Sequence, residues 1–340
     1  MIQRLAGLQL EDISFVGSDL YVPESVLCTA SGDVFATNRR CGVSRIRPDG
    51  GVQHIGDSEF VASRGMVPNG IALLGDGRFL VADTGPAGGV WRLAPDGTFS
   101  PFVLEIDGRA LSSTNFVLPD DRGRVWITIS TRQLPRDRAF SPAIADGYIA
   151  VWCDGRARIV ADGLQFANEV RLDPAGEFLY VNETFGERVT RFRVGADGSL
   201  RDREVFATLP RGGFAEGLAF DEDGGLWVTC IVSNRLYRIA PDRRIERILE
   251  DARAEALKDA IATFDAGRFT RSEMEHPSAA VLRNISSIAF GGPDRRTLFI
   301  CTAEWHPADD HVANLERLAT GPRTGEILTL PVEVPGTGRP

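Results

Sequence analysis

Long apolar segments are absent from this sequence. Its 340 residues contain no run that approaches the 18 or more apolar residues needed to cross a bilayer. Near the N-terminus, Glu11 and Asp12 interrupt the chain before the apolar segment of an export signal could form. We therefore expect neither a membrane partner nor export.

Cysteine and positive charge are also scarce. The five cysteines are odd in number, lack CxxC spacing and lie mostly in apolar, strand-like runs, so a reduced cytoplasmic compartment is expected. The 38 Lys and Arg residues are outnumbered by 47 Asp and Glu, which gives a net charge of −9. No basic surplus remains to neutralise a phosphate backbone, so nucleic acid is not expected as a partner. The oligomeric state is left open.

Several common catalytic motifs are missing as well. The chain has no GxSxG, GxxxxGK or GxGxxG segment, and its four histidines show no HExxH spacing. His306, in the segment TAEWHP, is kept as a candidate substrate contact because it follows the last repeat described below. The alternative is a loop histidine bonded to backbone.

A short repeat organises the chain. A Gly-containing turn followed by β-branched and aromatic residues occurs six times. Most copies are followed by a second strand-like run, such as VWRLAPDG (90–97), and then by a third, such as RIVADG (158–163). The six copies are SGDVFAT (31–37), GDGRFLVAD (75–83), DRGRVWITI (121–129), PAGEFLYVNE (174–183), EDGGLWVTC (222–230) and GPDRRTLFICTA (292–303).

Four short strands in a repeat of roughly 45 residues are typical of a β-propeller, in which radial packing protects the sheet edges. We therefore predict an all-β, six-bladed β-propeller that forms a single domain over residues 1–340. The sixth blade lacks an outer strand after residue 334, whereas LEDISFV (10–16) has no blade of its own. This N-terminal strand is expected to close the ring beside ILTLPVEV (327–334).

Two segments do not fit the repeat. Residues 131–147 form a polar, Pro-containing stretch that we expect to be a loop between the inner strands of blade three. Residues 251–283 have Leu257, Ile261 and Phe264 at helical spacing, then Gly267 as a stop and a possible capping box from Thr270 to Glu273. We predict a short helical insertion between blades five and six, and expect both segments to cover part of one face of the disc.

Polar residues occupy one register of the repeat, eight positions before the turn residue of each blade and at the start of the innermost strand. Innermost strands line the channel of a propeller, so these residues should converge at one mouth. The alternative is that they simply suit turns, although exposed turns elsewhere in the chain use Asp-Gly. The six residues are Glu24, Asn69, Asn115, Asn168, Glu216 and Ser286.

Two carboxylates and up to three amides form an all-oxygen environment that suits a hard divalent cation. We expect Ca²⁺, with Mg²⁺, Mn²⁺ and Zn²⁺ as alternatives and zinc as the poorest match. Such a cation can polarise a carbonyl and lower the pKa of a bound water, both of which favour hydrolysis of an ester or lactone.

Three segments resemble the senescence marker protein/gluconolactonase family, also called regucalcin-like, and the resemblance extends over essentially the full length. They are GLQFANEVRLDPAGEFLYVNET (163–184), GFAEGLAFDEDGGLWVTC (213–230) and ISSIAFGGPDRRTLFICTA (285–303). The resemblance implies a six-bladed propeller that hydrolyses lactones with a bound divalent metal. It places the family's metal ligands on Glu24, Asn115, Asn168 and Glu216. From its register we expect Asn69 nearby, as a substrate contact or a neighbour of the ligands.

The chain departs from the family pattern at informative positions. The usual Asp of blade five is Glu216, which is expected to act as general base as well as ligand. The usual Arg two residues before the blade-three Asn is Ser113, a substrate-binding position, so sugar lactones are disfavoured. The sequence thus predicts a metal-dependent hydrolase of a small lactone or ester. Two alternatives stay open: a protein-binding platform with a structural ion, and a metal-independent enzyme similar to the strictosidine synthase-like propellers.

Overall fold

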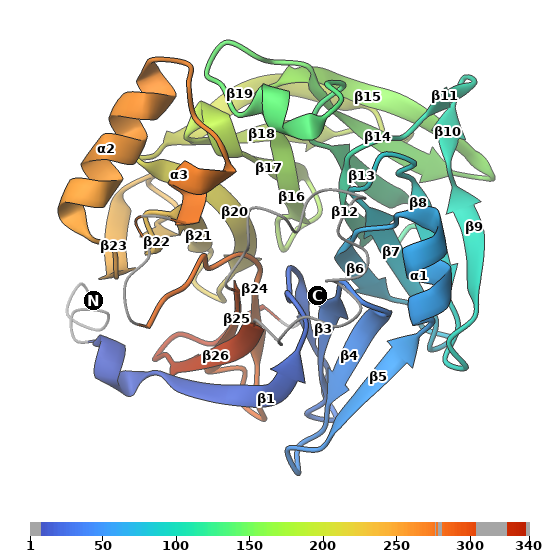
Figure 1. The fold of residues 1–340 in the computed structure, drawn as a ribbon, viewed down its shortest axis with the longest axis horizontal. Helices are drawn as coiled ribbons and strands as arrows, with labels where there is room; N and C mark the ends of the chain where they lie inside the picture. Colours follow the sequence, from blue (N-terminus) through green and yellow to red (C-terminus); the bar gives the residue numbers. More distant parts are fainter. Residues whose placement is uncertain (1–7, 276, 278–280, 304–324, 338–340) are drawn as a thin grey trace.

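Six four-stranded antiparallel sheets surround a central channel in the computed structural model (Figure 1). The structure describes residues 8–275, 277, 281–303 and 325–337. Each sheet is one blade, and its strands run in sequence order from the channel outward except in blade six. The predicted all-β, six-bladed propeller is confirmed.

The strands of the first three blades follow the predicted repeat. Blade one contains β2 (Val26–Cys28), β3 (Val34–Asn38), β4 (Gly42–Ile46) and β5 (Val52–Gly56). Blade two contains β6 (Pro68–Leu73), β7 (Phe79–Asp83), β8 (Val90–Leu93) and β9 (Phe99–Val103). Blade three contains β12 (Thr114–Pro119), β13 (Val125–Ile129), β14 (Gly147–Cys153) and β15 (Arg156–Leu164). A small hairpin, β10 (Glu105–Ile106) and β11 (Arg109–Ala110), joins blades two and three.

The other blades follow the same order. Blade four contains β16 (Ala167–Leu172), β17 (Phe178–Glu183), β18 (Arg188–Val194) and β19 (Leu200–Thr208). Blade five contains β20 (Gly213–Phe220), β21 (Leu226–Val232), β22 (Arg235–Ile239) and β23 (Ile245–Glu250). Blade six contains β24 (Ile288–Gly291), β25 (Thr297–Ala303), β26 (Gly325–Pro331) and, outermost, β1 (Ser14–Leu20).

Strand β1 closes the ring, as predicted. It pairs antiparallel with β26, with Ser14 opposite Thr329 and Val16 opposite Ile327. The two ends of the chain therefore share one sheet, which covers an edge that would otherwise be exposed. The strand begins later than expected, because Leu10–Asp12 form a 3-10 turn (η1) and pairing starts at Ser14.

The turn after each innermost strand has a residue in the left-handed region. Gly32, Gly123 and Gly224 have φ of +88°, +75° and +77°, a conformation that glycine adopts without strain. In blade six the residue that takes this position is Arg295 (φ +55°), whose N–H donates to Gly292 O at 3.1 Å. Arg295 follows Ser286 by nine positions, so the expected spacing of eight is one residue too short in blade six.

Aspartates at two of these turns also bind the second strand. Trp126 Nε1 donates to Asp120 Oδ2 at 3.0 Å, and Trp227 Nε1 donates to Asp221 Oδ2 at 2.8 Å. Both tryptophans are fully buried. Such bonds satisfy the indole N–H while the ring fills the space between blades.

Three helices lie outside the blades. The helix α1 (Ser58–Arg64) joins blades one and two and was not predicted; Asp57 caps it by accepting hydrogen bonds from the N–H groups of Glu59 and Phe60. The predicted insertion contains α2 (Ala254–Asp265) and α3 (Arg271–Glu275). Glu273 Oε2 accepts a hydrogen bond from Thr270 N at 2.7 Å, as the predicted capping box requires.

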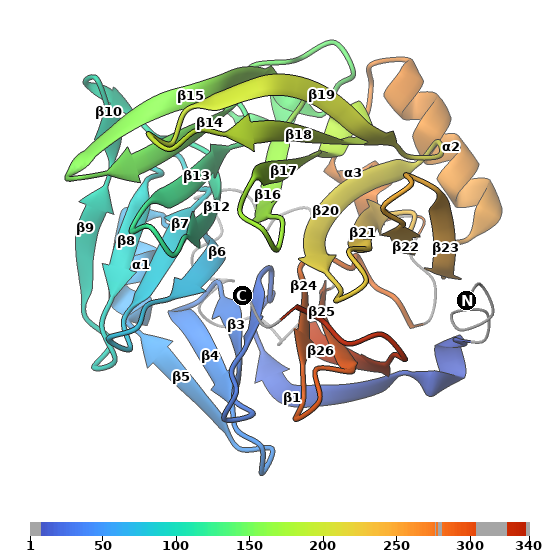
Figure 2. The ribbon, with the colours of Figure 1, turned by 180° about the vertical axis from the view of Figure 1, so that it is seen from behind.

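The 131–147 segment joins the second and third strands of blade three, β13 and β14, which lie between the innermost and outermost strands of the sheet. It contains a 3-10 turn, η2 (Arg136–Ala139). Figures 1 and 2 show α1 and α3 on the same side of the disc. No helix among the described residues is long and apolar enough to span a bilayer.

Candidate active site at the channel mouth

The polar register residues stand where the innermost strands begin. In blades two to five the strand pairing shifts at this point, between Pro68 and Ile71, Thr114 and Phe116, Ala167 and Val170, and Ala215 and Leu218. Such β-bulges re-aim side chains and are common beside active sites. Each of these bulges contains one register residue: Asn69, Asn115, Asn168 or Glu216. Their side chains therefore depart from the regular alternation in which successive side chains of a strand point to opposite faces.

Buried polar side chains of the second strands hold the bulged backbone. Asn182 Nδ2 donates to Glu216 O at 2.8 Å, and Thr229 Oγ1 accepts from Gly217 N at 2.8 Å. In blade three, Thr128 Oγ1 accepts from Phe116 N at 3.0 Å. Sequence analysis missed this set, although single Thr or Asn residues within otherwise apolar second strands were a usable signal.

Direct contacts link the register residues of neighbouring blades. Asn168 Nδ2 donates to Glu216 Oε2 at 2.7 Å and to Thr184 Oγ1 at 3.0 Å. Asn69 Nδ2 donates to the Asn115 backbone oxygen at 3.0 Å and lies 3.5 Å from Asn115 Oδ1. The residues of blades two and three, and of blades four and five, are thus brought together as predicted.

Glu24 has a cationic partner that sequence analysis did not anticipate. Arg39 Nη2 donates to Glu24 Oε1 at 2.7 Å, and the two side chains are only 2% and 4% exposed. Burial raises the pKa of Glu24, while the charges of Arg39, Arg271 and Arg136 act in the opposite direction. Three guanidinium groups from separate segments therefore influence one carboxylate.

Glu216 is the most perturbed carboxyl group of the mouth. Burial and the charge of Glu24 raise its pKa to about 8, against the hydrogen bond from Asn168 and the charge of Arg136. The carboxylates of Glu24 and Glu216 are therefore close enough to repel each other. Burial also raises the pKa of Glu169, the residue after Asn168, to about 7.

Residues two positions before the register show backbone strain. Val22, Ser113, Phe166 and Asn284 have φ of +44°, +59°, +64° and +48°. A β-branched valine in this region is a clear outlier, and strain of this kind gathers at functional sites. Ser113, predicted to face substrate, is buried at this strained position.

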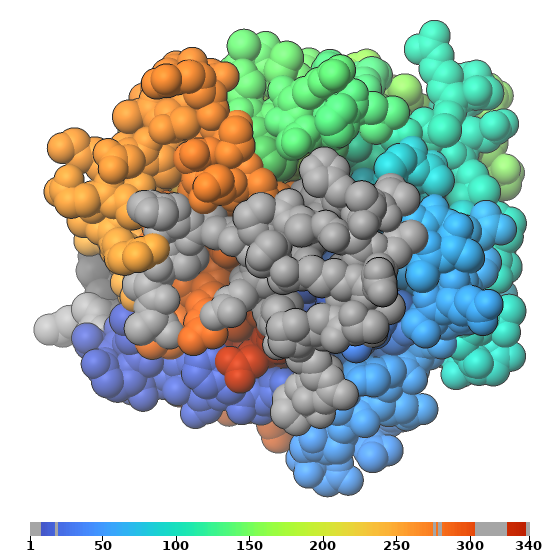
Figure 3. Space-filling view, viewed as in Figure 1, coloured from blue at the N-terminus to red at the C-terminus, as the bar shows by residue number. Residues whose placement is uncertain are grey.

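Both insertions pack on the face that carries the mouth. One buried cluster contains Phe140 of the 131–147 segment and Phe264 and Phe269 of the 251–283 insertion, together with Phe166 and Phe214. Phe166 and Phe214 each stand two residues before a register position. Figure 3 shows the orange atoms of the insertion beside the green atoms of blade three and four segments on this face. Both segments therefore lie on the face of the disc that carries the register residues.

These two segments also bring Arg136 and Arg271 to the mouth. The Arg136 guanidinium lies 5.1 Å from the ring centroid of Phe166, and the Arg271 guanidinium lies 5.6 Å from that of Phe140. Burial and the neighbouring Arg39 charge lower the pKa of Arg136 to about 10. No sequence signal distinguished these arginines from surface ones, because their position depends on how the insertions fold back.

Of the two remaining predicted residues, Ser286 and His306, the structure describes only Ser286. Ser286 is buried and its N–H donates to Cys301 O at 3.0 Å, so blade six offers only a short polar side chain near the register. His306 lies outside the described residues.

The residues at the mouth fit a hard divalent cation. No group of three or more His, Cys, Asp or Glu side chains suited to a metal occurs among the described residues, so a site here depends on amides as well as carboxylates. Asn168 Nδ2 donates hydrogen bonds to Thr184 and Glu216, which leaves the Asn168 Oδ1 atom to bind a metal. Glu24 Oε1 accepts the hydrogen bond from Arg39, which leaves Glu24 Oε2 to bind a metal. The charge of Glu24 raises the pKa of Glu216, and a cation between two such carboxylates would stabilise the ionised form of both.

A six-bladed propeller with an oxygen-lined channel mouth is the class that fold and site define. The chain belongs to the SMP-30/Gluconolactonase/LRE-like family, whose characteristic region matches residues 42–254. The resemblance inferred from the sequence is thereby confirmed.

Two curated relatives are similar to the chain. A 6-deoxy-6-sulfogluconolactonase of Pseudomonas putida is 25% identical over 296 residues, covering 86% of this chain and 84% of the relative. The pentonolactonase XacC of Haloferax volcanii is 28% identical over 208 residues, covering 54% and 67%.

Solved structures support the fold. A gluconolactonase of Xanthomonas campestris has a TM-score of 0.65 at 21% identity and covers 97% of this chain and 91% of its own. A calcium-binding regucalcin of Agrobacterium tumefaciens has a TM-score of 0.63 at 17% identity, covering 98% and 96%. At these identities the likeness concerns the architecture alone.

Proposed function

We propose that the protein is a metal-dependent hydrolase of small lactones or esters. The observation that carries this proposal is that two carboxylates, the buried Glu24 and the half-buried Glu216, lie with the amides of Asn115 and Asn168 at one channel mouth. Family membership and the lactonase names of two relatives support the reaction class.

Glu24, Asn115, Asn168 and Glu216 would hold the cation, with Ca²⁺ preferred. When bound, the cation would polarise the substrate carbonyl and lower the pKa of water. Glu216 in its ionised form would accept the proton of the attacking water, and the Arg136 charge favours that form by lowering the Glu216 pKa. Asn168 holds the Glu216 carboxylate in place through the 2.7 Å hydrogen bond.

The range of possible substrates depends on more residues than Ser113. Sequence analysis disfavoured sugar lactones because Ser113 replaces an arginine that binds hydroxyl groups. The mouth nevertheless receives Arg39, Arg136 and Arg271 from other segments, and each acts electrostatically on Glu24. We therefore include polyhydroxylated and anionic lactones in the proposed range, since guanidinium groups bind both hydroxyl and acidic oxygens.

A panel of sugar lactones, simple lactones and aryl esters, assayed with and without a chelator, tests the proposal. We expect hydrolysis that chelation abolishes and Ca²⁺ restores, and a loss of about a hundredfold or more in Glu216→Gln. The matched control is Glu59→Gln, an exposed glutamate of α1, which should retain full activity.

Other outcomes would redirect the assignment. Hydrolysis that survives both chelation and Glu216→Gln would contradict the mechanism and favour a metal-independent enzyme, in which another acidic residue near the channel, such as Glu24, acts without a metal. No turnover across the whole panel would favour a binding platform.

A further inference from the structure

A cavity occupies the end of the channel opposite the mouth. Its volume is about 640 Å³, and it is lined by the last residues of all six innermost strands and by the turns that follow them. The register residues of the mouth stand at the beginnings of the same strands. Arg171, in the cavity, is three residues after Asn168, which along an extended strand corresponds to about 10 Å. The cavity and the proposed active site are therefore separate.

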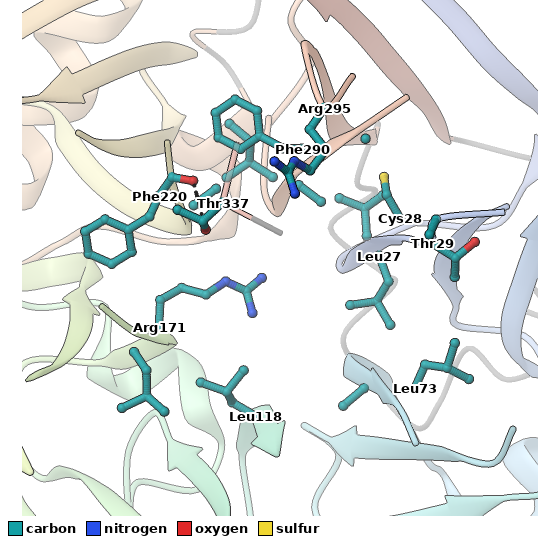
Figure 4. Close-up of a pocket in the computed structure, with 18 of the residues that line it drawn as sticks. Leu27, Cys28, Thr29, Leu73, Leu118, Arg171, Phe220, Phe290, Arg295 and Thr337 are labelled. Atoms are coloured by element: carbon teal, nitrogen blue, oxygen red, sulfur yellow. Dashed lines mark hydrogen bonds between the residues drawn. The ribbon is translucent and has the colours of Figure 1, made fainter. Parts of the chain in front are cut away.

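One residue of each blade faces this cavity at the same register, five positions before the left-handed turn residue. Four of the six are aliphatic and one is aromatic, whereas blade four alone contributes a cation (Figure 4). The six residues are Leu27, Ala72, Leu118, Arg171, Ala219 and Phe290. An arginine in a ring of apolar side chains is costly to bury unless it has a binding role or a strong partner.

The internal partners of Arg171 leave its terminal nitrogens available. The side chain is 9% exposed. Its Nε donates to Leu218 O at 2.9 Å, and its guanidinium lies 5.2 Å from the Phe116 ring centroid. Arg171 also forms an ion pair with Glu169, but the 3.8 Å between Nη2 and Glu169 Oε2 is too long for a hydrogen bond. Among the described residues, Nη1 and Nη2 donate no hydrogen bond, and Figure 4 shows the guanidinium directed into the cavity.

The other charges around the cavity are neutralised or exposed. Asp120 accepts hydrogen bonds from Arg124 and Trp126, and Arg295 is paired with Glu222. Asp121 and Asp294 lie on exposed turns at the rim, where solvent screens them. Arg171 is therefore the charged group that a buried ligand would meet.

We propose that this cavity is a second ligand site for a small organic acid, with the carboxylate held by Arg171 and an aliphatic or aromatic body against the apolar ring. Guanidinium groups bind carboxylates through two parallel hydrogen bonds. The volume matches that of small-molecule sites, which combine apolar walls with few polar anchors. The site goes beyond the proposed hydrolase function and does not depend on it.

Calorimetry with 4-phenylbutyrate and its neutral analogue 4-phenylbutanamide tests the proposal. Wild type should bind the acid at least tenfold more tightly than the amide. Arg171→Met should lose at least tenfold in affinity for the acid, and Ala72→Phe, which fills the cavity but keeps the charge, should abolish binding. Glu216→Gln, at the other end of the channel, should bind the acid as wild type does.

A double variant guards against misfolding. If Arg171→Met does not fold because Glu169 is left unpaired, Arg171→Met combined with Glu169→Gln removes both charges and serves in its place. Equal affinity for acid and amide, unchanged affinity in Ala72→Phe, or no binding of the acid at millimolar concentration would overturn the proposal. Loss of binding in Glu216→Gln would also overturn it, by assigning the acid to the mouth.

Discussion

Arg39 donates a hydrogen bond from Nη2 to Glu24 Oε1 at 2.7 Å, and this ion pair is almost completely buried at the mouth of the channel. It joins the turn after β3 to the segment just before β2. The pair reduces the negative charge of the mouth while leaving one Glu24 oxygen for other partners. Its removal should therefore affect both stability and ion binding.

Arg39→Met should lower the free energy of unfolding by about 3 kcal/mol in the presence of chelator, because Glu24 is left buried without its partner. Saturating Ca²⁺ should recover part of the loss, because a cation at the mouth replaces the missing charge. Urea unfolding with and without Ca²⁺ measures both effects. Arg47→Met, in an exposed pair with Asp49, is the control and should change stability by less than about 1 kcal/mol. A loss that Ca²⁺ leaves unchanged would contradict a cation at Glu24.

Thr184→Val should weaken Ca²⁺ binding by about tenfold, since Thr184 Oγ1 accepts the hydrogen bond that orients Asn168. Asn168→Ala should weaken it at least as much. Calorimetric titration measures both affinities, and Thr98→Val, at an exposed turn, is the control. If Asn168→Ala bound calcium as tightly as wild type, the proposed ligand set would be wrong.

Phe264→Ala should lower the free energy of unfolding by about 3–5 kcal/mol, because a buried aromatic ring is replaced by a cavity. The Phe264 side chain is 1% exposed, and its ring centroid lies 5.0 Å from that of Phe214 and 5.7 Å from that of Phe185. Urea unfolding is the measurement. Phe15→Ala, at a residue 45% exposed, should cost far less. Equal effects would show that the insertion does not share the core of the mouth.

Asp83→Asn should change how stability depends on pH. Burial raises the pKa of Asp83 to about 6 from 3.8, although its Oδ1 accepts hydrogen bonds from Val67 N and Gly85 N. The folded state thus binds the proton more tightly than the unfolded state, so this group's contribution is complete below about pH 4 and is lost as pH rises through about 6. The loss is on the order of 2–3 kcal/mol.

Asparagine keeps an acceptor for both N–H groups and does not titrate, so Asp83→Asn should gain stability relative to wild type as pH rises from about 4.5 to 7.5. Urea unfolding at several pH values measures the difference. The control is Asp259→Asn on the exposed side of α2, which should show no such drift. A constant difference between wild type and Asp83→Asn would contradict a raised pKa at Asp83.

The sequence by itself determined the six blades and the register of Glu24, Asn69, Asn115, Asn168 and Glu216. Turn glycines and strand composition are local properties that recur once per blade, so their period can be counted in the printed chain. Closure by the N-terminal strand followed from the count of strands. Blade six lacked an outer strand, and the strand near the N-terminus had no blade of its own. The helices of the 251–283 insertion were equally local, since their apolar spacing and capping residues lie within the segment.

The tertiary structure alone decided what surrounds those residues. Arg39, Arg136 and Arg271 reach the mouth from three segments far apart in sequence, and nothing in their local patterns marks them. The same is true of Arg171, whose apolar neighbours in the cavity come one from each of the other blades. Charge interactions and burial depend on distances in space. Residues of different blades come close to one another only when the ring has closed. A period in the sequence can therefore locate a site, but the electrostatic character of that site arises from contacts between blades.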